Sequence, residues 1–264
     1  MIVTTSQAPA QELLAYAEAL AKELNAPFIH RREMSVRKLM ARYGGAHILV
    51  ATEHELRLYE RDSMDKPLVY HPSMALPKLK GMLQGNEEAL IRYSGCQPGD
   101  VVLDCTAGLC SDSLVFSLAV GADGKVIALE SEQLLYIVVR EGLAQYKVNV
   151  QEIEQAMRRI ELKLVDHERY LASLPDNSVD IVYFDPMFRQ PLHESSAIGA
   201  IRSMANKHAL TELTIADAKR VARKCVMLKE HSMSEEFERL GFTRCQEARG
   251  QRIAYGVIAR SHNK

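Results

Sequence analysis

The spacing of apolar and polar residues changes once along this chain, close to residue 85. Before that point, apolar residues recur at helical spacing in two stretches, and two short runs have the character of strands. The predicted elements are helices at 9–24 and 36–42, the second with Ser35 as its N-cap, and hairpin strands at 47–51 and 55–59. We therefore predict a small N-terminal α+β cap over residues 1–85.

Over residues 86–264, predicted strands and helices alternate. The strands are expected at 101–103, 126–129, 162–165, 181–184 and 225–228, and the helices at 87–93, 112–120, 132–145, 210–222 and 234–240. Such alternation is typical of a parallel sheet with helices on both faces, a Rossmann-like α/β fold. Two last runs, 242–247 and 252–258, are joined by a short loop, so the sheet should end in an antiparallel hairpin.

The composition is that of an ordinary globular protein. Of 264 residues, 47% are hydrophobic and 25% are charged. No apolar run reaches the roughly 20 residues that span a membrane, and the first residues have no export signal. Five cysteines without a Cys-x-x-Cys spacing indicate neither a disulfide framework nor a zinc site. We expect a cytoplasmic protein that uses no metal and no membrane.

A turn that could hold a nucleotide-like cofactor follows the first strand of the large domain. In an open α/β sheet, ligands bind beyond the carboxyl ends of the strands. Gly108 lies in that turn and allows a ligand to approach the backbone closely, and Ser111 stands at the start of the next helix. Glu130 ends the next strand, about 20 positions later, which is the spacing of a carboxylate that binds ribose hydroxyls.

The turn lacks the glycines of a dinucleotide site. Cys110 and Ser113 stand where the second and third glycines would be, and Asp112 would repel a pyrophosphate. This disfavours NAD and FAD and suits S-adenosylmethionine, which has no phosphate and carries a positive charge. Asp104 could face its ammonium end, and Asp166 could accept a hydrogen bond from its adenine amine. An ordinary strand-to-helix turn is the alternative.

A second turn, Asp185-Pro186-Met187-Phe188, ends the strand at 181–184 and suits a flat ring with an amine. The carboxylate of Asp185 can accept from an exocyclic amine and draw its nitrogen toward an attacking geometry. Pro186 fixes its own φ and has no N–H, so neighbouring carbonyls can also accept. Phe188 offers a face on which a base can stack. The alternative is a turn that only ends the strand.

These motifs resemble those of a known family. The segments 104–109 and 185–188, together with Glu130, are similar to the class I methyltransferases that methylate the guanine N2 amine of bacterial small-subunit rRNA, as is the run from His71 to Gly85. The resemblance implies a class I methyltransferase sheet, S-adenosylmethionine as cofactor, and rRNA or the small ribosomal subunit as partner. The family commonly has glycine where Cys110 stands, so a sister branch with another substrate is an alternative.

The candidate site residues follow from the motifs and the resemblance together. The catalytic candidates are Asp185, Pro186 and Phe188. The cofactor-binding candidates are Asp104, Thr106, Ala107, Gly108, Ser111, Asp112, Glu130, Ser131 and Asp166. The net charge of −1 shows no overall excess of positive charge, so RNA contacts must come from local basic patches. The RNA-binding candidates are His71, Lys78, Lys80, Arg31, Arg32 and Lys38.

Other readings remain open from the sequence alone. A second basic run follows the substrate turn and includes Lys219, Arg220, Arg223 and Lys224, but most such runs are solvated helix faces. A methyltransferase for small molecules or proteins would act without RNA. A non-catalytic RNA-binding factor would keep the fold and bind RNA without S-adenosylmethionine. The oligomeric state also stays open, with a homodimer as one option.

Overall fold

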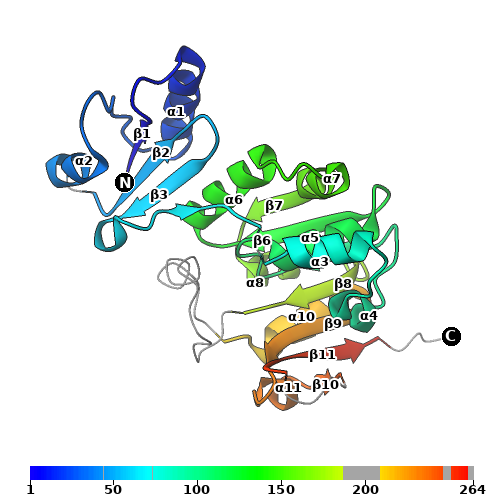
Figure 1. Cartoon of the computed structure of the whole chain (residues 1–264). Coiled ribbons are helices and arrows are strands. Elements are labelled where there is room, and N and C mark those ends of the chain that lie inside the picture. Colours follow the sequence, from blue (N-terminus) through cyan, green and yellow to red (C-terminus); the bar gives the residue numbers. More distant parts are fainter. Residues whose placement is uncertain (44, 73, 187–208, 246–250, 261–264) are drawn as a thin grey trace. The chain divides into compact units, whose positions relative to one another are not determined.

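The computed structural model describes residues 1–43, 45–72, 74–186, 209–245 and 251–260 (Figure 1). Phe188 lies outside this described part, so its predicted stacking role stays a prediction. The contacts divide the chain into two compact units. The first contains Met1–His71 and Ile137–Lys147, and the second contains Pro72–Tyr136 and the described residues from Val148 onward. These units are defined by contacts within the structure, and the domain boundary that we expect near residue 85 stays a prediction.

The first unit contains a four-stranded sheet in the order β1-β2-β3-β4. Its strands are β1 (Ile2–Thr5), β2 (His47–Ala51), β3 (Leu56–Glu60) and β4 (Leu68–Val69). Strands β2 and β3 form the predicted antiparallel hairpin, while β1 pairs with β2 in parallel. Strand β1 was not predicted, because a four-residue run is too short to show a period.

Two helices bury their apolar faces in the first unit. Helix α1 (Gln11–Glu23) buries Leu13, Ala17, Leu20 and Ala21. Helix α2 (Val36–Tyr43) begins after Ser35, whose Oγ accepts a hydrogen bond from the backbone N–H of Lys38 at 3.2 Å. Ser35 is thus the N-cap that the sequence predicts. The polar residues of α2 stay on its outer face.

The second unit is built around a seven-stranded sheet in the order β10-β11-β9-β8-β5-β6-β7. Its strands are β5 (Val101–Asp104), β6 (Lys125–Glu130), β7 (Ile160–Leu164), β8 (Val179–Phe184), β9 (Ala222–His231), β10 (Thr243–Arg244) and β11 (Ile253–Ala259). Strands β5 to β9 pair in parallel, and β11 pairs antiparallel with both β9 and β10. The predicted Rossmann-like sheet with an antiparallel end is confirmed.

Helices lie on both faces of this sheet (Figure 1). They are α3 (Leu76–Leu83), α4 (Ala89–Ser94), α5 (Ser111–Val120), the first turn of α6 (Gln133–Gln145), α7 (Gln151–Arg159), α8 (His167–Ser173), α10 (Glu212–Val221) and α11 (Glu236–Arg239). Along β8, Phe184 packs in the same core cluster as Ile215 of α10. Tyr183 points to the other face, where its ring meets Phe116 of α5 at 5.3 Å.

Neighbouring strands order the ligand loops along one edge of the sheet. Strand β5 lies between β6 and β8, so the loops after these three strands are adjacent. The strand order reverses beside β5, since β6 and β7 follow on one side and β8 and β9 on the other. Such a reversal is where open α/β sheets bind ligands. In the part of the chain that the structure describes, no helix is long and apolar enough to cross a membrane.

Candidate active site

The hydroxyl of Thr106 joins the two predicted ligand turns. Its Oγ1 accepts a hydrogen bond from the backbone N–H of Asp185 at 2.6 Å. The backbone N–H of Thr106 in turn donates to Oδ1 of Asp104 at 3.0 Å. Because Asp104 and Tyr183 are paired across β5 and β8, both turns leave the same edge of the sheet. The predicted cofactor and substrate turns are therefore neighbours.

The turn after β5 leaves room for a ligand at its backbone. Gly108 has φ of +50°, and a side-chain carbon placed there would meet no atom within 4 Å. The turn is held by hydrogen bonds from the backbone N–H of Ala107 to Leu129 at 3.0 Å and from that of Cys110 to Ala107 at 2.6 Å. A fixed turn with open space over a glycine fits the close approach of a cofactor.

Glu130 presents a carboxylate that its own loop has arranged. The residue is 9% exposed, and Oε1 accepts a hydrogen bond from the backbone N–H of Glu132 at 2.8 Å. Burial raises the pKa of Glu130 to about 7, although the N–H groups of Glu132, Ser131 and Gly108 pull it down. The hydrogen bond from Gly108 places Glu130 beside the β5 turn. A carboxylate fixed in this way can accept hydroxyl donors without rearranging.

Asp104 lies beneath the turn and uses both of its oxygens there. The residue is 1% exposed, and its carboxylate accepts hydrogen bonds from the hydroxyl of Ser113 and the backbone N–H of Thr106. Burial raises the pKa of Asp104 to about 7. In this arrangement Asp104 fixes the shape of the turn. Its predicted contact with the ammonium end of a cofactor stays a prediction.

Asp166 is placed beside the Glu130 loop. The backbone N–H of Val165 donates to the carbonyl of Glu130 at 2.9 Å, which brings the loops after β6 and β7 together. Oδ1 of Asp166 caps helix α8 by accepting from the N–H groups of Glu168 at 2.9 Å and Arg169 at 3.3 Å. The cap holds the carboxylate at the ligand edge, where its role toward adenine stays a prediction.

A cluster of partly buried charged side chains lies next to the substrate turn. Nζ of Lys229 donates to Oδ2 of Asp185 and to Oδ2 of Asp112, each at 2.6 Å. Asp112 also accepts from the hydroxyl of Tyr183 at 2.7 Å, and Lys78 lies 3.4 Å from its Oδ1. Asp112, in the first turn of α5, contacts these three residues, and its predicted role toward the cofactor stays a prediction.

The charges of this cluster set the pKa values of its two aspartates. Burial acts to raise the pKa of Asp112, but the ammonium groups of Lys229 and Lys78 prevail and hold it below its usual range. At Asp185 burial prevails over Lys229, and the pKa is raised. Lys78 also pairs with Glu88 at 3.2 Å. The cluster thus contains three carboxyl groups and two ammonium groups beside the ligand edge, and this excess of acidic groups suits a cationic cofactor.

Comparison with known families gives the class of this protein. Residues 33–252 match the family described as "Putative SAM-dependent methyltransferase", where SAM is S-adenosylmethionine. This chain belongs to that methyltransferase family. The family confirms the predicted cofactor, and the space over Gly108 beside the Glu130 carboxylate is compatible with it.

Two relatives and one solved structure are similar to this chain over different lengths. The methyltransferase is 38% identical over 260 residues to the uncharacterized protein YpiP of Bacillus subtilis, covering 98% of this chain and 100% of YpiP. It is 36% identical over 107 residues to ribosomal RNA small subunit methyltransferase J of Acinetobacter baumannii, covering 39% of this chain and 37% of that relative. A SAM-dependent methyltransferase from Neisseria gonorrhoeae shares the fold, with a TM-score of 0.62, 14% identity, and coverage of 100% of this chain and 98% of that one.

The RNA-binding candidates of this methyltransferase fall into both units. In the second unit, Lys78 belongs to the charge cluster, while Lys80 is exposed on the same helix α3. In the first unit, Arg32 and Lys38 are exposed, and Nε of Arg31 donates to the carbonyl of Met34 at 3.1 Å. The exposed His71 makes an edge contact with the ring of Tyr146 at 5.3 Å. Their roles toward RNA stay predictions.

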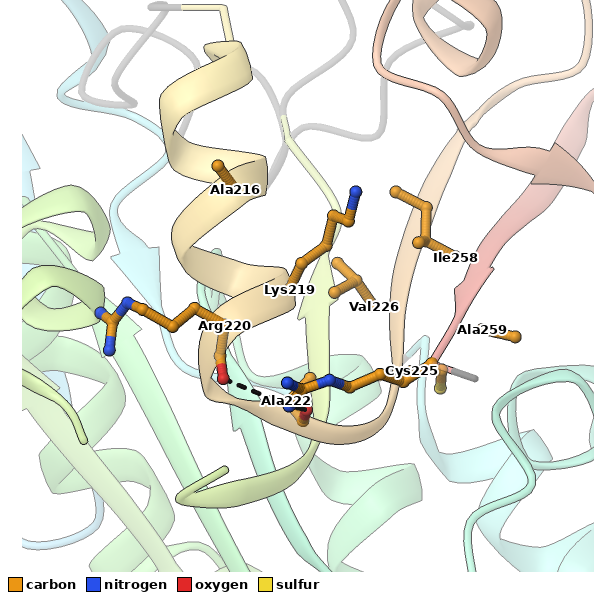
Figure 2. A pocket seen from close by; sticks show the side chains of 9 residues that line it. Ala216, Lys219, Arg220, Ala222, Cys225, Val226, Ile258 and Ala259 are labelled. Atoms are coloured by element: carbon orange, nitrogen blue, oxygen red, sulfur yellow. Dashed lines mark hydrogen bonds between the residues drawn. The ribbon is translucent and has the colours of Figure 1, made fainter. Parts of the chain in front are cut away.

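The second basic run of the methyltransferase is largely occupied by ion pairs. Arg220 pairs with Asp176 and Asp217, Arg223 pairs with Asp180, and Lys224 pairs with Asp100. Figure 2 shows residues that line the adjoining cavity, which come from α10, β9 and β11 and from Arg260 just after β11. The volume of the cavity is about 270 Å³. Since Ala222 and Cys225 pair with the beginning of β8, this region lies at the end of the strands opposite Asp185. These ion pairs hold the strand beginnings together.

Lys229 was missed in the sequence although a usable signal was present. It directly follows the strand predicted at 225–228, so it had to lie at the same sheet edge as Asp185. A lysine that continues a buried strand is unusual, because burial disfavours its charge, so it could have been singled out as a functional candidate. Among the described residues, no group of three or more His, Cys, Asp or Glu side chains is placed to hold a metal ion.

Proposed function

We propose that this methyltransferase transfers the methyl group of S-adenosylmethionine to an exocyclic amine of an RNA base, with guanine N2 of small-subunit rRNA as the target. The observation that carries the proposal is the hydrogen bond between Thr106 and Asp185, which sets a carboxylate-bearing substrate turn beside the cofactor turn. A methyl donor and an amine acceptor must meet at such a junction, because in-line placement supplies most of the rate of a displacement.

The cofactor would be held by the loops after β5, β6 and β7. Glu130 would accept the ribose hydroxyls, the Gly108 turn would lie against the cofactor, and Asp166 would accept from the adenine amine. When bound, S-adenosylmethionine supplies an electrophilic methyl group: the N–C bond forms as the C–S bond breaks, and its electron pair stays on sulfur. The excess of acidic groups in the Asp112 cluster favours a positively charged ligand at this edge.

Asp185 would orient the substrate amine and take its proton. An exocyclic amine is a weak nucleophile because its lone pair is conjugated with the ring. A hydrogen bond from the amine to the Asp185 carboxylate directs the lone pair toward the methyl group. After transfer the nitrogen carries an extra proton, which the carboxylate can accept and pass to water. The raised pKa of Asp185 makes it a better proton acceptor than an ordinary aspartate.

Two observations support RNA as the substrate. The relative from Acinetobacter baumannii acts, by its name, on small-subunit rRNA and shares 36% identity with this chain over 107 residues. In addition, helix α2 and the loop before it carry exposed basic side chains, among them Arg32 and Lys38, without acidic residues in the helix. Basic side chains of this kind contact phosphates and position a nucleic acid without reading its sequence.

The test is mapping of modified nucleotides in small-subunit rRNA by mass spectrometry, in cells with and without the protein. Loss of one N2-methylguanine, restored by the wild type, is expected. Asp185→Ala should fail to restore it while still binding S-adenosylmethionine in calorimetry. Asp176→Ala, which removes a carboxylate from the opposite strand end, is the matched control and should restore the mark. An unchanged rRNA, or full activity of Asp185→Ala, would refute the proposal.

A further inference from the structure

We propose that Lys229 is a positioning residue of the methyltransferase: it holds one carboxylate oxygen of Asp185, so that the other oxygen accepts from the substrate amine. Asp112 holds Lys229 in turn. This inference rests on the proposed role of Asp185 and deepens it. It assigns a specific function to Lys229 within the charge cluster.

The two oxygens of Asp185 have different surroundings. Oδ2 accepts from Nζ of Lys229 at 2.6 Å. Among the residues that the structure describes, no donor is recorded for Oδ1. The backbone N–H of Asp185 is fixed by Thr106, so the residue is held at its main chain and at one side-chain oxygen. A carboxylate held at two points has one oxygen left for a substrate, and its orientation is set before the substrate arrives.

Lys229 itself is held by a second carboxylate, that of Asp112. Its side chain is only 15% exposed, and its ammonium group lies between Asp185 and Asp112. Asp112 is fixed by donors from three elements, because Tyr183 on β8, Lys78 on α3 and Lys229 on β9 all approach it. A movement of the ammonium group away from Asp185 would therefore also disturb its hydrogen bond with Asp112.

Removing the charge should affect the two aspartates together. In Lys229→Met, Asp112 and Asp185 would face each other without the shared cation, and two neighbouring carboxylates disfavour each other's ionised form. Asp185 would then hold a proton and lose its ability to accept from the amine. Cofactor binding uses the other loops, so it should change little. The expected signature is a loss in kcat with near-normal affinity for S-adenosylmethionine.

The chain contains a matched control on the same strand. Lys224 also belongs to β9 and pairs with Asp100 at 2.7 Å, but it lies near the strand's beginning, away from the ligand loops. Lys224→Met removes the same type of charge from the same strand. It should lower stability without lowering turnover, so it separates a structural effect from a positioning effect.

The experiment measures turnover on small ribosomal subunits that lack the modification, together with S-adenosylmethionine affinity. We expect Lys229→Met to lose about 100-fold in kcat or more, with cofactor Kd within about threefold, as for loss of a positioned catalytic group. Lys229→Arg should recover at least about tenfold of that loss. Equal kcat in Lys229→Met and the wild type, or an equal loss in Lys224→Met, would overturn the inference.

A second measurement does not depend on the substrate. Urea unfolding of Lys229→Met, Asp185→Asn and the double variant gives the coupling between the two side chains, because each single change removes the ion pair. Direct contact predicts non-additive changes, of about threefold or more in the unfolding equilibrium constant. Additive changes would overturn the contact. If the variants show this coupling but the wild-type enzyme leaves small-subunit rRNA unmodified, the proposed function alone is refuted.

Discussion

Glu130 provides the sharpest prediction about cofactor binding, because its pKa lies in the range of ordinary buffers. In the unliganded protein the pKa of Glu130 is about 7. About one tenth of the side chain is therefore ionised at pH 6 and about nine tenths at pH 8. If the carboxylate accepts the ribose hydroxyls, S-adenosylmethionine should bind roughly tenfold more weakly at pH 6 than at pH 8.

The variant Glu130→Gln removes the charge and keeps the shape. A hydrogen bond to a charged group contributes about 1.5–3 kcal/mol, so the variant should bind S-adenosylmethionine roughly 10- to 150-fold more weakly at pH 8. At pH 5.5 the wild-type side chain is itself neutral, and the two proteins should differ by only a few fold. The Kd of Glu130→Gln divided by the Kd of the wild type should therefore rise as the pH increases past about 7, the pKa of Glu130.

Isothermal titration calorimetry between pH 5.5 and 8.5 measures this ratio directly. The amino group of the ligand and the buried Asp104 also titrate, but both are common to the two proteins and cancel in the ratio. A ratio that stays constant with pH would refute the reasoning. So would a variant that binds within about twofold of the wild type at pH 8.

The same shift has a consequence for stability without the ligand. The folded protein favours protonated Glu130, whereas the unfolded chain ionises it near the ordinary value of 4.5. The free energy of unfolding should therefore fall as pH rises from about 4.5 to about 7, by an amount on the order of 3 kcal/mol. Urea unfolding at pH 5 and pH 8 should show a smaller fall for Glu130→Gln than for the wild type.

Two further predictions concern glycines in different surroundings. Gly142→Ala would place a side-chain carbon 2.0 Å from the ring of Tyr70, so it should lower the free energy of unfolding by about 1–3 kcal/mol, measured by urea denaturation. An unchanged midpoint would refute that packing. Gly108→Val would enter the open space at the cofactor turn and strain its φ of +50°. It should weaken S-adenosylmethionine binding at least about tenfold, and normal calorimetric affinity would show that the cofactor lies elsewhere.

The sheet of the large unit was predictable because its strands are apolar runs separated by helices of ordinary length. Helix α7 was missed although Ile153, Ala156 and Met157 have helical spacing, because most of its other residues are polar. Helix α3 contains a proline in its first turn and a glycine, and both residues weaken a prediction of helix. In each case tertiary packing decided what local preference left open.

The sequence predicted where the candidate site lies in the fold better than it predicted which side chains contact one another there. Asp185 and Glu130 could be placed at one edge because the carboxyl ends of parallel strands share it. The partners of Asp112 depend on which strand lies beside which, and that order is not written in any single segment. Lys78 illustrates the limit: the sequence did not show that the fold brings it to Asp112 and Glu88, and its predicted contact with RNA stays a prediction.

The hydroxyl of Thr106 gives the two ligands a shared element. Thr106 belongs to the turn that is expected to contact the methyl donor. Its hydroxyl also accepts a hydrogen bond from the backbone N–H of Asp185, the residue that is expected to contact the methyl acceptor. A change in that turn on cofactor binding would reach Asp185 through this hydrogen bond. Thermodynamic linkage then requires reciprocity. If bound S-adenosylmethionine changes the affinity for the substrate by some factor, bound substrate must change the affinity for S-adenosylmethionine by the same factor.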